Sequence, residues 1–468
     1  MCGIIGIYSF KSVSQMIYNG LLTLQHRGQD ASGIATIHKT KLTLIKKKGL
    51  VKNIFNKRNI LNKLKGNIGI GHVRYSNRKF NSINEAQPFY VNYPYGLCLV
   101  HNGNITNKNE LKNKISIAHH HINSYSDSEI LLNIIAYQFS KYNYNNLCAK
   151  NIFNIFNLIF KEVKGAYSCI LLIIGYGLIA FRDPNGIRPL VIGTKYIKKI
   201  KKKEYMIASE SITLESLGFQ EIRDVNPGEV ICLEKNGKFY NHKCIKNTKL
   251  IPCLFEFIYF ARPDSYIDNI SVSEARLEMG KILAKKIKKT WKNTKIDVVI
   301  PIPDTSYNTA LEISRILNIP YRQGFIKNNY SGRSFIINEK NQRNKTLSTK
   351  FIVNKIYFKN KNILLIDDSI IRGDTAKKVI FLAKTAGAKK IFFASAAPQA
   401  KFANIYGINI PSSKKLISYN RKLKEIKNII GADKLIFQDL KELIKALKKK
   451  NKKIENFESS IFNGKYIT

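Results

Sequence analysis

The chain has 468 residues, 44% of them hydrophobic, which excludes a mainly disordered protein and predicts two or three domains with cores of their own. Its 78 lysines and arginines outnumber 32 acidic residues and give a net charge of +46, but they are spread along the whole chain. We therefore interpret this charge as a solvated surface and expect no nucleic-acid partner.

The cysteines and the apolar segments predict a cytoplasmic protein. Seven cysteines without a C-x-x-C pair exclude a disulfide framework and indicate a reducing compartment. Residues 1–6 show no charged segment followed by an apolar one, so we expect no signal peptide. The most apolar stretch, residues 167–181, contains two glycines and is shorter than the roughly 20 residues of a membrane span. We expect a buried hairpin there and no membrane partner.

The first half of the chain alternates short strands with helices. Strands are predicted over 42–46, 68–75 and 97–101, followed by the hairpin at 167–181 and a second hairpin that turns at Asn236 and Gly237. Apolar residues at helical spacing predict helices over 128–138 and 152–161. Sheets covered by helices are expected, in a domain that spans residues 2–240.

The second half, residues 241–468, has the pattern of a parallel α/β sheet. Ser271 and Glu274 predict a capping box at the start of a long helix. The segments that follow alternate in type, with strands over 296–300, 362–366 and 391–396 and helices over 310–317 and 376–386. The two halves are joined without a flexible Gly/Ser linker, so we expect them to pack closely.

Cys2 is the first candidate for chemistry. If Met1 is removed, as a small second residue permits, Cys2 carries a thiol and a free α-amine on one residue. The amine has a pKa near ~8 and the thiol near ~8.5, so the amine can accept the thiol proton during nucleophilic attack. Taken alone, Cys2 is better interpreted as a small buried core residue.

Four separated motifs around Cys2 occur in a defined order. They are residues 1–7 (MCGIIGI), 25–33 (QHRGQDASG), 71–75 (GHVRY) and 101–104 (HNGN). This series resembles the N-terminal-nucleophile glutamine amidotransferases, which have an αββα sandwich fold. The resemblance implies that Cys2 attacks the glutamine amide and that Asn102 and the backbone N–H of Gly103 form the oxyanion hole. Two neutral donors aimed at a developing oxyanion lower the barrier by ~3 kcal/mol each.

The same resemblance assigns the glutamine-binding residues. Arg74 is expected to bind the substrate α-carboxylate and Asp127 its α-ammonium. Alone, Arg74 would be interpreted as a surface cation and Asp127 as the N-cap of the helix that follows it. After Tyr75 the family has a small Pro-Thr-Ala-Gly-like loop, whereas this chain has Ser-Asn-Arg-Lys-Phe at 76–80, so closure over glutamine is expected to differ.

A second site follows an apolar strand in the second half. The strand at 363–366 leads into Asp367 and Asp368 and then into a turn that enters a helix. Carboxylates at the carboxyl end of a parallel strand lie where open α/β sheets bind ligands, and backbone N–H groups at a helix N-terminus bind phosphate. An acidic turn with Thr375 as a plain helix cap is the alternative.

This arrangement resembles the phosphoribosyltransferase signature for phosphoribosyl pyrophosphate (PRPP). By that resemblance Asp367 and Asp368 bind the ribose hydroxyls and one Mg²⁺ per subunit, with Thr305 of the 301–306 loop as a further metal ligand. The turn that follows would cradle the 5-phosphate through Ser369, Arg372, Gly373, Asp374 and Thr375. Asp374 departs from the threonine of many relatives, and we expect its side chain to point away from the phosphate.

The resemblance also includes a lid. Lys327, Tyr330 and Arg333 match a loop that closes over PRPP, where positive charge neutralises the departing pyrophosphate and water is excluded. Taken singly, the two cations would be interpreted as ordinary surface charge in so basic a chain.

Both signatures on one chain, in this order, resemble the amidophosphoribosyltransferase family. That resemblance implies synthesis of 5-phosphoribosylamine, glutamate and pyrophosphate from glutamine, PRPP and water, with Tyr75, Tyr259 and Ile336 in the wall of an internal ammonia passage. It also implies purine nucleotides as feedback inhibitors and a homo-oligomer, a tetramer. Some members carry an iron–sulfur cluster on cysteines of the C-terminal half. Because no cysteine follows Cys253, we expect no such cluster here.

Two other interpretations of the sequence stay open. The first domain alone also fits a sugar-phosphate aminating or asparagine-forming amidotransferase, although the Asp367-Asp368 motif counts against this. A PRPP-sensing nucleic-acid regulator would explain the basic composition, although the presence of Cys2, Arg74 and Asn102 counts against it.

Overall fold

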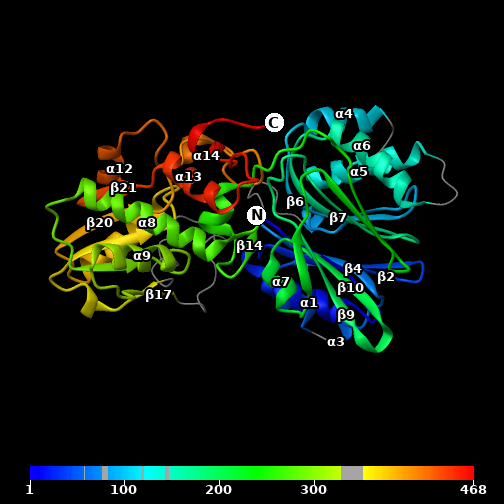
Figure 1. Ribbon diagram of the computed structural model, residues 1–468, viewed down its shortest axis with the longest axis horizontal. Coiled ribbons are helices and arrows are strands. Elements are labelled where there is room, and N and C mark those ends of the chain that lie inside the picture. Colours follow the sequence, from blue (N-terminus) through cyan, green and yellow to red (C-terminus); the bar gives the residue numbers. More distant parts are fainter. Residues whose placement is uncertain (57, 76–82, 118–120, 143–146, 328–350) are drawn as a thin grey trace.

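The computed structural model describes residues 1–56, 58–75, 83–117, 121–142, 147–327 and 351–468. The first half of the chain forms two facing antiparallel sheets, and the second half forms a parallel sheet with helices on both faces (Figure 1). Each half has its own apolar core, and further apolar residues lie between the halves.

Strand β1 lies in the middle of the first sheet, paired with β10 on one side and β4 on the other. All strand pairs of this sheet are antiparallel. In spatial order the seven strands are β11 (Gln220–Asp224), β9 (Val191–Ile197), β10 (Lys202–Ala208), β1 (Gly3–Tyr8), β4 (Ile68–Arg74), β2 (Ala31–His38) and β3 (Lys41–Lys48). Cys2 directly precedes β1 and is therefore placed at the end of a central strand.

The second sheet contains both predicted hairpins. Residues 167–181 form most of the β7–β8 hairpin, and Asn236 and Gly237 turn the chain between β12 and β13. In spatial order its six strands are β13 (Phe239–Lys243), β12 (Glu229–Glu234), β8 (Gly177–Arg182), β7 (Gly165–Ile173), β6 (Leu97–Ile105) and β5 (Phe89–Val91). The last strand, β13, spans the domain boundary that we placed at residue 240.

Alternation along the strands fixes the layers of the first half. In β1, Ile4 packs between the two sheets, whereas the next residue, Ile5, packs against helices on the outer face. The helices outside the first sheet are α1 (Ser14–Thr23), α2 (Val51–Phe55), α3 (Arg58–Leu61) and α7 (Ser211–Glu215). Those outside the second sheet are α4 (Lys108–Ile117), α5 (Asp127–Ser140) and α6 (Ala149–Glu162). The predicted αββα sandwich is confirmed.

The second half is the predicted parallel sheet with crossover helices. Its strand order is β16 (Val298–Pro301), β19 (Asn362–Asp367), β20 (Lys390–Ser395) and β21 (Lys434–Phe437). Helices α8 (Val272–Thr290) and α9 (Tyr307–Leu317) cover one face. Helices α11 (Asp374–Thr385) and α12 (Leu423–Ile430) cover the other. Two short hairpins flank the sheet, β14 (Tyr266–Ile267) with β15 (Ile270–Ser271) and β17 (Phe325–Lys327) with β18 (Phe351–Val353).

The two halves share a buried apolar cluster, so they pack closely, as predicted. Met1 and Ala166 of the first half lie in this cluster with Ile408 of the second. Helices α13 (Leu440–Lys450) and α14 (Ser460–Asn463) contribute to it as well. The N-terminus consequently lies at the junction of the two halves (Figure 1). Within the described residues, no helix has both the length and the apolar character that a bilayer crossing requires.

Several element ends differ from the predictions for local reasons. Helix α5 begins at Asp127 because Ser126 is its N-cap, with Ser126 Oγ accepting from Ser128 N, so Asp127 is not the cap. Only half of the predicted capping box forms at α8. Ser271 Oγ accepts from Glu274 N at 3.3 Å, but the Glu274 carboxylate pairs with Lys450 instead.

Candidate functional sites

Strand β6 brings Asn102 and Gly103 next to Cys2. The backbone nitrogen of Cys2 donates to Asn102 Oδ1 at 3.1 Å. The other end of that amide, Asn102 Nδ2, is buried and has no hydrogen-bond partner among the described residues. A buried amide donor without an acceptor is costly unless a ligand supplies one. Asn102 Nδ2 thus lies beside the predicted nucleophile, where an oxyanion donor is expected.

Gly103 occupies a position that no other residue can take without rearrangement. Its φ is +151°, and a β-carbon would lie 1.9 Å from the Ala166 carbonyl oxygen on the neighbouring strand β7. Strand β6 was predicted to end at residue 101, but it continues to Ile105 because Asn102, Gly103 and Asn104 pair in register with β7. The predicted oxyanion-hole residues, Asn102 and Gly103, are thus part of the sheet.

The predicted glutamine-binding residues lie around the same strand. Asp127, at the first turn of α5, accepts the backbone N–H of Ile105 at 2.9 Å. Arg74 ends β4, and its Nη2 lies 3.6 Å from Glu85 Oε2. The chain at Gly28 passes so close to Arg74 that a β-carbon there would lie 2.4 Å from the Arg74 carbonyl carbon. This contact explains the glycine of the QHRGQD motif. Residues 76–80 lie outside the described part of the chain.

Burial favours the neutral form of two histidines near this site, His72 and His101. Burial, together with the charge of Arg74, holds the pKa of His72 well below its usual range. Burial also lowers the pKa of His101, whose Nδ1 lies 2.9 Å from Ser128 Oγ. Neither ring therefore adds positive charge to the surroundings of Cys2.

A buried ion network contacts the predicted nucleophile, Cys2, and sequence reasoning missed it. Arg27 Nε donates to the Cys2 carbonyl at 2.9 Å, while its two terminal nitrogens pair with Glu210 at 2.6 Å and Glu256 at 2.7 Å. Burial alone would raise the pKa of Glu210, but His26 and Arg27 bring it well below its usual range. Arg27 belongs to the 25–33 motif, but its partners Glu210 and Glu256 lie far away along the chain.

When Met1 is present, its α-amine is buried at the junction of the two halves, which disfavours the charged form of the amine. Met1 is buried, and burial lowers the pKa of its α-amine to about 5. An ammonium group in this apolar surrounding would pay a desolvation cost.

The second site forms where β16 and β19 end side by side. The two strands are parallel, with Pro301 opposite Ile366, so the loop after β16 meets the turn after β19. Thr305 Oγ1 donates a hydrogen bond to Asp368 Oδ2. Ser369 Oγ donates to the other oxygen of Asp368 at 2.6 Å. The structure therefore brings together the predicted metal ligands Thr305, Asp367 and Asp368.

The turn that follows has the form of a phosphate cradle. Helix α11 begins at Asp374, with Gly373 as an N-cap that has no side-chain hydrogen bond. This excludes the alternative in which Thr375 caps the helix. Gly373 has φ +87°, and a β-carbon there would lie 2.4 Å from Ile417 Cδ1. The first-turn N–H groups of α11 are left without a capping side chain and can bind an anion.

Cationic side chains surround this turn. Arg372 lines a cavity of about 240 Å³ together with four other cations, and none of the described residues lining it is acidic. The full lining is Arg372, Lys377, Lys414, Lys415, Leu416, Ile417, Arg421 and Ile429. Lys327, at the end of β17, forms an ion pair with Asp304 of the 301–306 loop. Of the predicted lid residues, Tyr330 and Arg333 lie outside the described part of the chain, as does Ile336.

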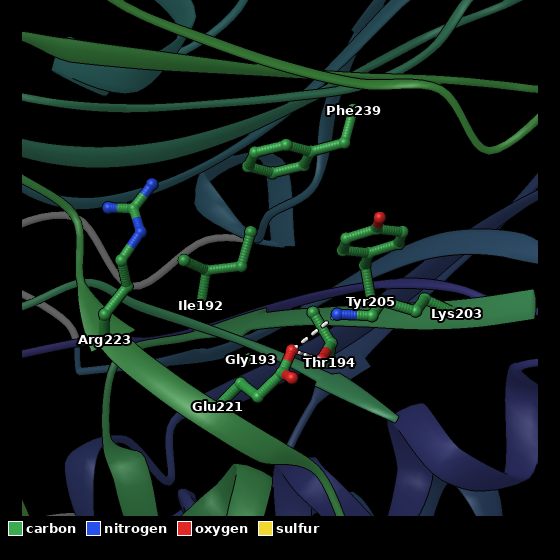
Figure 2. Close-up of a pocket in the computed structure, with 8 residues that line it drawn as sticks. All are labelled: Ile192, Gly193, Thr194, Lys203, Tyr205, Glu221, Arg223 and Phe239. Carbon is green, nitrogen blue, oxygen red and sulfur yellow. Dashed lines mark hydrogen bonds and ion pairs between the residues drawn. The ribbon is translucent and has the colours of Figure 1, made fainter. Parts of the chain in front are cut away.

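A pocket of about 250 Å³ lies away from both sites, on the edge of the first half. Figure 2 shows it lined by residues of β9, β10, β11 and β13, with Glu221 held by Thr194 and Lys203 at 2.6 and 2.7 Å. Tyr205 and Phe239 stack with their ring centroids 5.4 Å apart. Arg223 pairs with Glu229. Because these charges are already paired, this pocket lacks the reactive groups that the two sites contain.

Comparison with known proteins matches both halves. A glutamine amidotransferase domain model matches residues 72–216, and a phosphoribosyl transferase domain model matches residues 267–406. The amidophosphoribosyltransferase of Escherichia coli K12 is 51% identical over 470 residues, covering 100% of this chain and 93% of the relative. That of Saccharomyces cerevisiae is 42% identical, covering 100% of this chain and 92% of the relative.

Solved structures agree over the whole chain. The glutamine PRPP amidotransferase of B. subtilis, complexed with ADP and GMP, is 32% identical with a TM-score of 0.86, covering 100% of this chain and 97% of that one. A structure described as the allosteric regulatory enzyme of purine biosynthesis is 31% identical with a TM-score of 0.87, covering 100% of this chain and 96% of that one.

Proposed function

The chain belongs to the amidophosphoribosyltransferase family, and we propose how its two sites divide that family's reaction. It is a pentosyltransferase that forms 5-phosphoribosylamine, glutamate and pyrophosphate from glutamine, PRPP and water, the first committed step of purine synthesis. In this division, Cys2 releases the nitrogen of glutamine as ammonia in the first half, and the ammonia reacts with PRPP bound at the turn after β19 in the second half.

The observation that carries the proposal is the arrangement of the Asn102 amide. Its oxygen holds the Cys2 nitrogen, and its nitrogen is a buried donor that lacks an acceptor among the described residues. One side chain therefore positions the nucleophile and presents a hydrogen-bond donor beside it. Such a fixed donor stabilises an oxyanion more than water molecules do, because the donor does not have to reorient during the reaction.

The glutaminase steps follow from this geometry. Once Met1 is removed, the Cys2 amine accepts the thiol proton and the sulfur attacks the amide carbon of glutamine. Asn102 Nδ2 and the Gly103 N–H stabilise the oxyanion. The intermediate then expels ammonia, which takes up the proton, and leaves a thioester. Water hydrolyses the thioester, which releases glutamate and restores the thiol.

The substrate is oriented by its two charged groups. Arg74 binds the α-carboxylate of glutamine through two nitrogens, and Asp127 binds the α-ammonium. Both residues flank β6, so the side-chain amide of glutamine extends toward Cys2. Charge at the far end of the substrate thereby sets the position of its reacting end.

In the second half, ammonia attacks C1 of the PRPP ribose as the bond to pyrophosphate breaks. We propose that Asp367 and Asp368 hold the ribose hydroxyls and that Ser369, Arg372, Gly373, Asp374 and Thr375 surround the 5-phosphate. Lys327, Tyr330 and Arg333 are proposed to close over the substrate. The carboxylates of Asp367 and Asp368 and the hydroxyl of Thr305 are hard oxygen donors suited to one Mg²⁺ per subunit. When bound, Mg²⁺ would neutralise charge on the departing pyrophosphate.

Ammonia must reach this site unprotonated. In water at neutral pH it is mostly ammonium, which has no lone pair for attack on ribose. The apolar cluster between the halves, to which Ala166 of the first half and Ile408 of the second belong, supports a dry path from Cys2 toward the second half. We propose that Tyr75 and Tyr259 contribute to its wall.

The test is synthesis from two nitrogen sources in the wild-type protein and in Cys2→Ala. The variant should lose glutamine-dependent synthesis of phosphoribosylamine and retain synthesis from added ammonia, because only the first site needs the thiol. Cys148→Ala, which removes an exposed thiol elsewhere, serves as the control and should keep both activities. Glutamine use that survives Cys2→Ala would contradict the proposal.

Four further properties are proposed from the family. Purine nucleotides should inhibit the enzyme, in line with the ADP and GMP bound to the B. subtilis relative, and inhibition assays would show it. We also propose a homotetramer, measurable by light scattering, and a cytoplasmic location. Because no cysteine follows Cys253, we propose that the protein has no iron–sulfur cluster. Stoichiometric iron in the purified protein would contradict this.

A further inference from the structure

A short segment of the second half contacts β6 directly beside the oxyanion-hole residues. Asn104 Nδ2 donates to the Ile405 carbonyl at 2.8 Å. Gly407 approaches Gly103 so closely that a β-carbon on Gly407 would lie 3.0 Å from the Gly103 carbonyl oxygen. Between them, the Tyr406 carbonyl accepts two hydrogen bonds from Arg188, at 2.9 and 2.5 Å. Ile405 and Gly407 of the second half thus contact β6 beside the predicted oxyanion-hole residues, and Tyr406 between them is held by Arg188.

Asn404 holds this segment in shape. Its Oδ1 accepts from the backbone nitrogens of Tyr406 and Ile408 at 2.9 and 3.0 Å. Its own backbone nitrogen donates to the Ile410 carbonyl at 3.0 Å. Because these bonds close the segment on itself, its contact with β6 is made by a defined surface.

The same stretch of chain reaches the other site. The Ile417 nitrogen donates to the Ile371 carbonyl in the phosphate turn at 2.9 Å. The Ile417 side chain also fills the space where a β-carbon at Gly373 would lie. Residues 404–417 therefore touch the oxyanion strand at one end and the phosphate turn at the other.

We propose that Asn104 is a positioning residue for glutamine hydrolysis, through which residues 404–417 hold the oxyanion hole in its working geometry. This inference rests on the proposed roles of Asn102 and Gly103. Oxyanion donors act only when they lie within a few tenths of an ångström of the right place, so a tether one residue away affects turnover. In the proposed function, glutamine is bound by the side chains of Arg74 and Asp127. Asp127 is held by the backbone N–H of Ile105, not by the Asn104 side chain.

The test is the steady-state kinetics of Asn104→Ala with glutamine and with ammonia. We expect kcat with glutamine to fall roughly five- to tenfold, the effect of losing one such hydrogen bond. KM for glutamine and ammonia-dependent synthesis should stay within about twofold, because binding and the second site are untouched. Asn107→Ala is the matched control. It removes the same type of amide-to-carbonyl bond, to Glu162 O at 3.0 Å, together with side-chain bonds to Glu110 and Lys164. All three bonds lie within the first half, so kcat with glutamine should be unchanged.

A second variant tests the tether from the other side. Asn404→Ala loosens the segment that Asn104 contacts and should lower kcat with glutamine in the same way. If both act through one contact, the double variant should be no slower than the slower single variant, whereas independent effects multiply. Three outcomes would overturn the inference. The effects of the two variants could multiply, Asn104→Ala could behave like Asn107→Ala, or Asn104→Ala could raise KM and leave kcat unchanged. Failure of the proposed function would give a different result, because the Cys2→Ala variant would then keep glutamine-dependent synthesis at the wild-type level.

Discussion

The glutamine site and the PRPP site are built differently. Around Cys2 the supporting groups are buried and already paired, with Arg27 locked between Glu210 and Glu256. At the phosphate turn, Arg372 and Asp374 are exposed, and the Lys327 side chain is 37% exposed. The proposed glutamine site therefore rests on buried ion pairs, whereas the proposed PRPP site presents exposed charged side chains. The difference suits the chemistry, since an oxyanion hole acts through fixed donors and a phosphate cradle through charge that gathers around an anion.

The largest expected effect is a loss of synthesis at the second site that leaves glutamine hydrolysis at the first site measurable. Asp367→Asn removes a carboxylate from the ribose and metal site, so synthesis from either nitrogen source should fall by on the order of 10²- to 10³-fold. Glutamine hydrolysis at Cys2 should remain measurable as glutamate release. Asp439→Asn, at an exposed ion pair with Lys286, is the control and should be near wild type. Glutamate release that falls in parallel with synthesis would show that the sites are not separate.

The rigidity of the glutamine site can be tested at a single glycine. In Gly103→Ala the new methyl group meets the Ala166 carbonyl oxygen, which belongs to a paired strand and cannot move easily. We expect kcat with glutamine to fall about 100-fold or more. Gly175→Ala is the matched control, because its φ is also positive, at +84°, but no described atom lies within 4 Å of the new carbon. Equal activity of the two variants would contradict the assignment of Gly103.

A smaller effect should appear in substrate binding. Arg74→Lys keeps the charge but loses the planar fork that matches a carboxylate, so KM for glutamine should rise roughly tenfold. The ammonia-dependent reaction should not change, since it bypasses glutamine. A variant that loses kcat at unchanged KM would place Arg74 in the chemical step instead of in binding.

The smallest predicted change concerns thiol reactivity. Burial raises the pKa of the Cys98, Cys244 and Cys253 thiols to about 12, so they carry almost no thiolate at pH 8. Iodoacetamide at that pH should label the exposed Cys148 and the half-buried Cys2, as peptide mass spectrometry would show. Activity with glutamine should fall with the labelling of Cys2 and not with that of Cys148. Early labelling of Cys253 would contradict the packing at the junction.

The sequence predicted the fold through its periodic parts. The α5 helix was predicted over 128–138 and spans Asp127–Ser140, because its apolar residues repeat at helical spacing and are buried. Strand β6 was predicted too short, because Asn102 and Gly103 are poor strand formers and only their pairing with β7 keeps them in the sheet. The strand propensities of single residues do not reveal such pairing with a distant strand.

The candidate sites were predictable where residues of one site are neighbours in the chain. Asp367 and Asp368 follow one strand, and the topology of the parallel sheet brings Thr305 to them. The Arg27 network left no such signal, since Arg27, Glu210 and Glu256 come from three distant segments and ion pairs have no periodicity. The contact between Asn104 and Ile405 was missed for the same reason.

The central claim is that the mature chain begins at Cys2 and that this residue attacks glutamine. The most direct measurement is mass spectrometry of the active enzyme after reaction with a chloroketone analogue of glutamine. We expect a chain that lacks Met1 and carries one label per subunit, on the N-terminal cysteine. Full activity in a chain that still carries Met1, or a label on another residue, would contradict it.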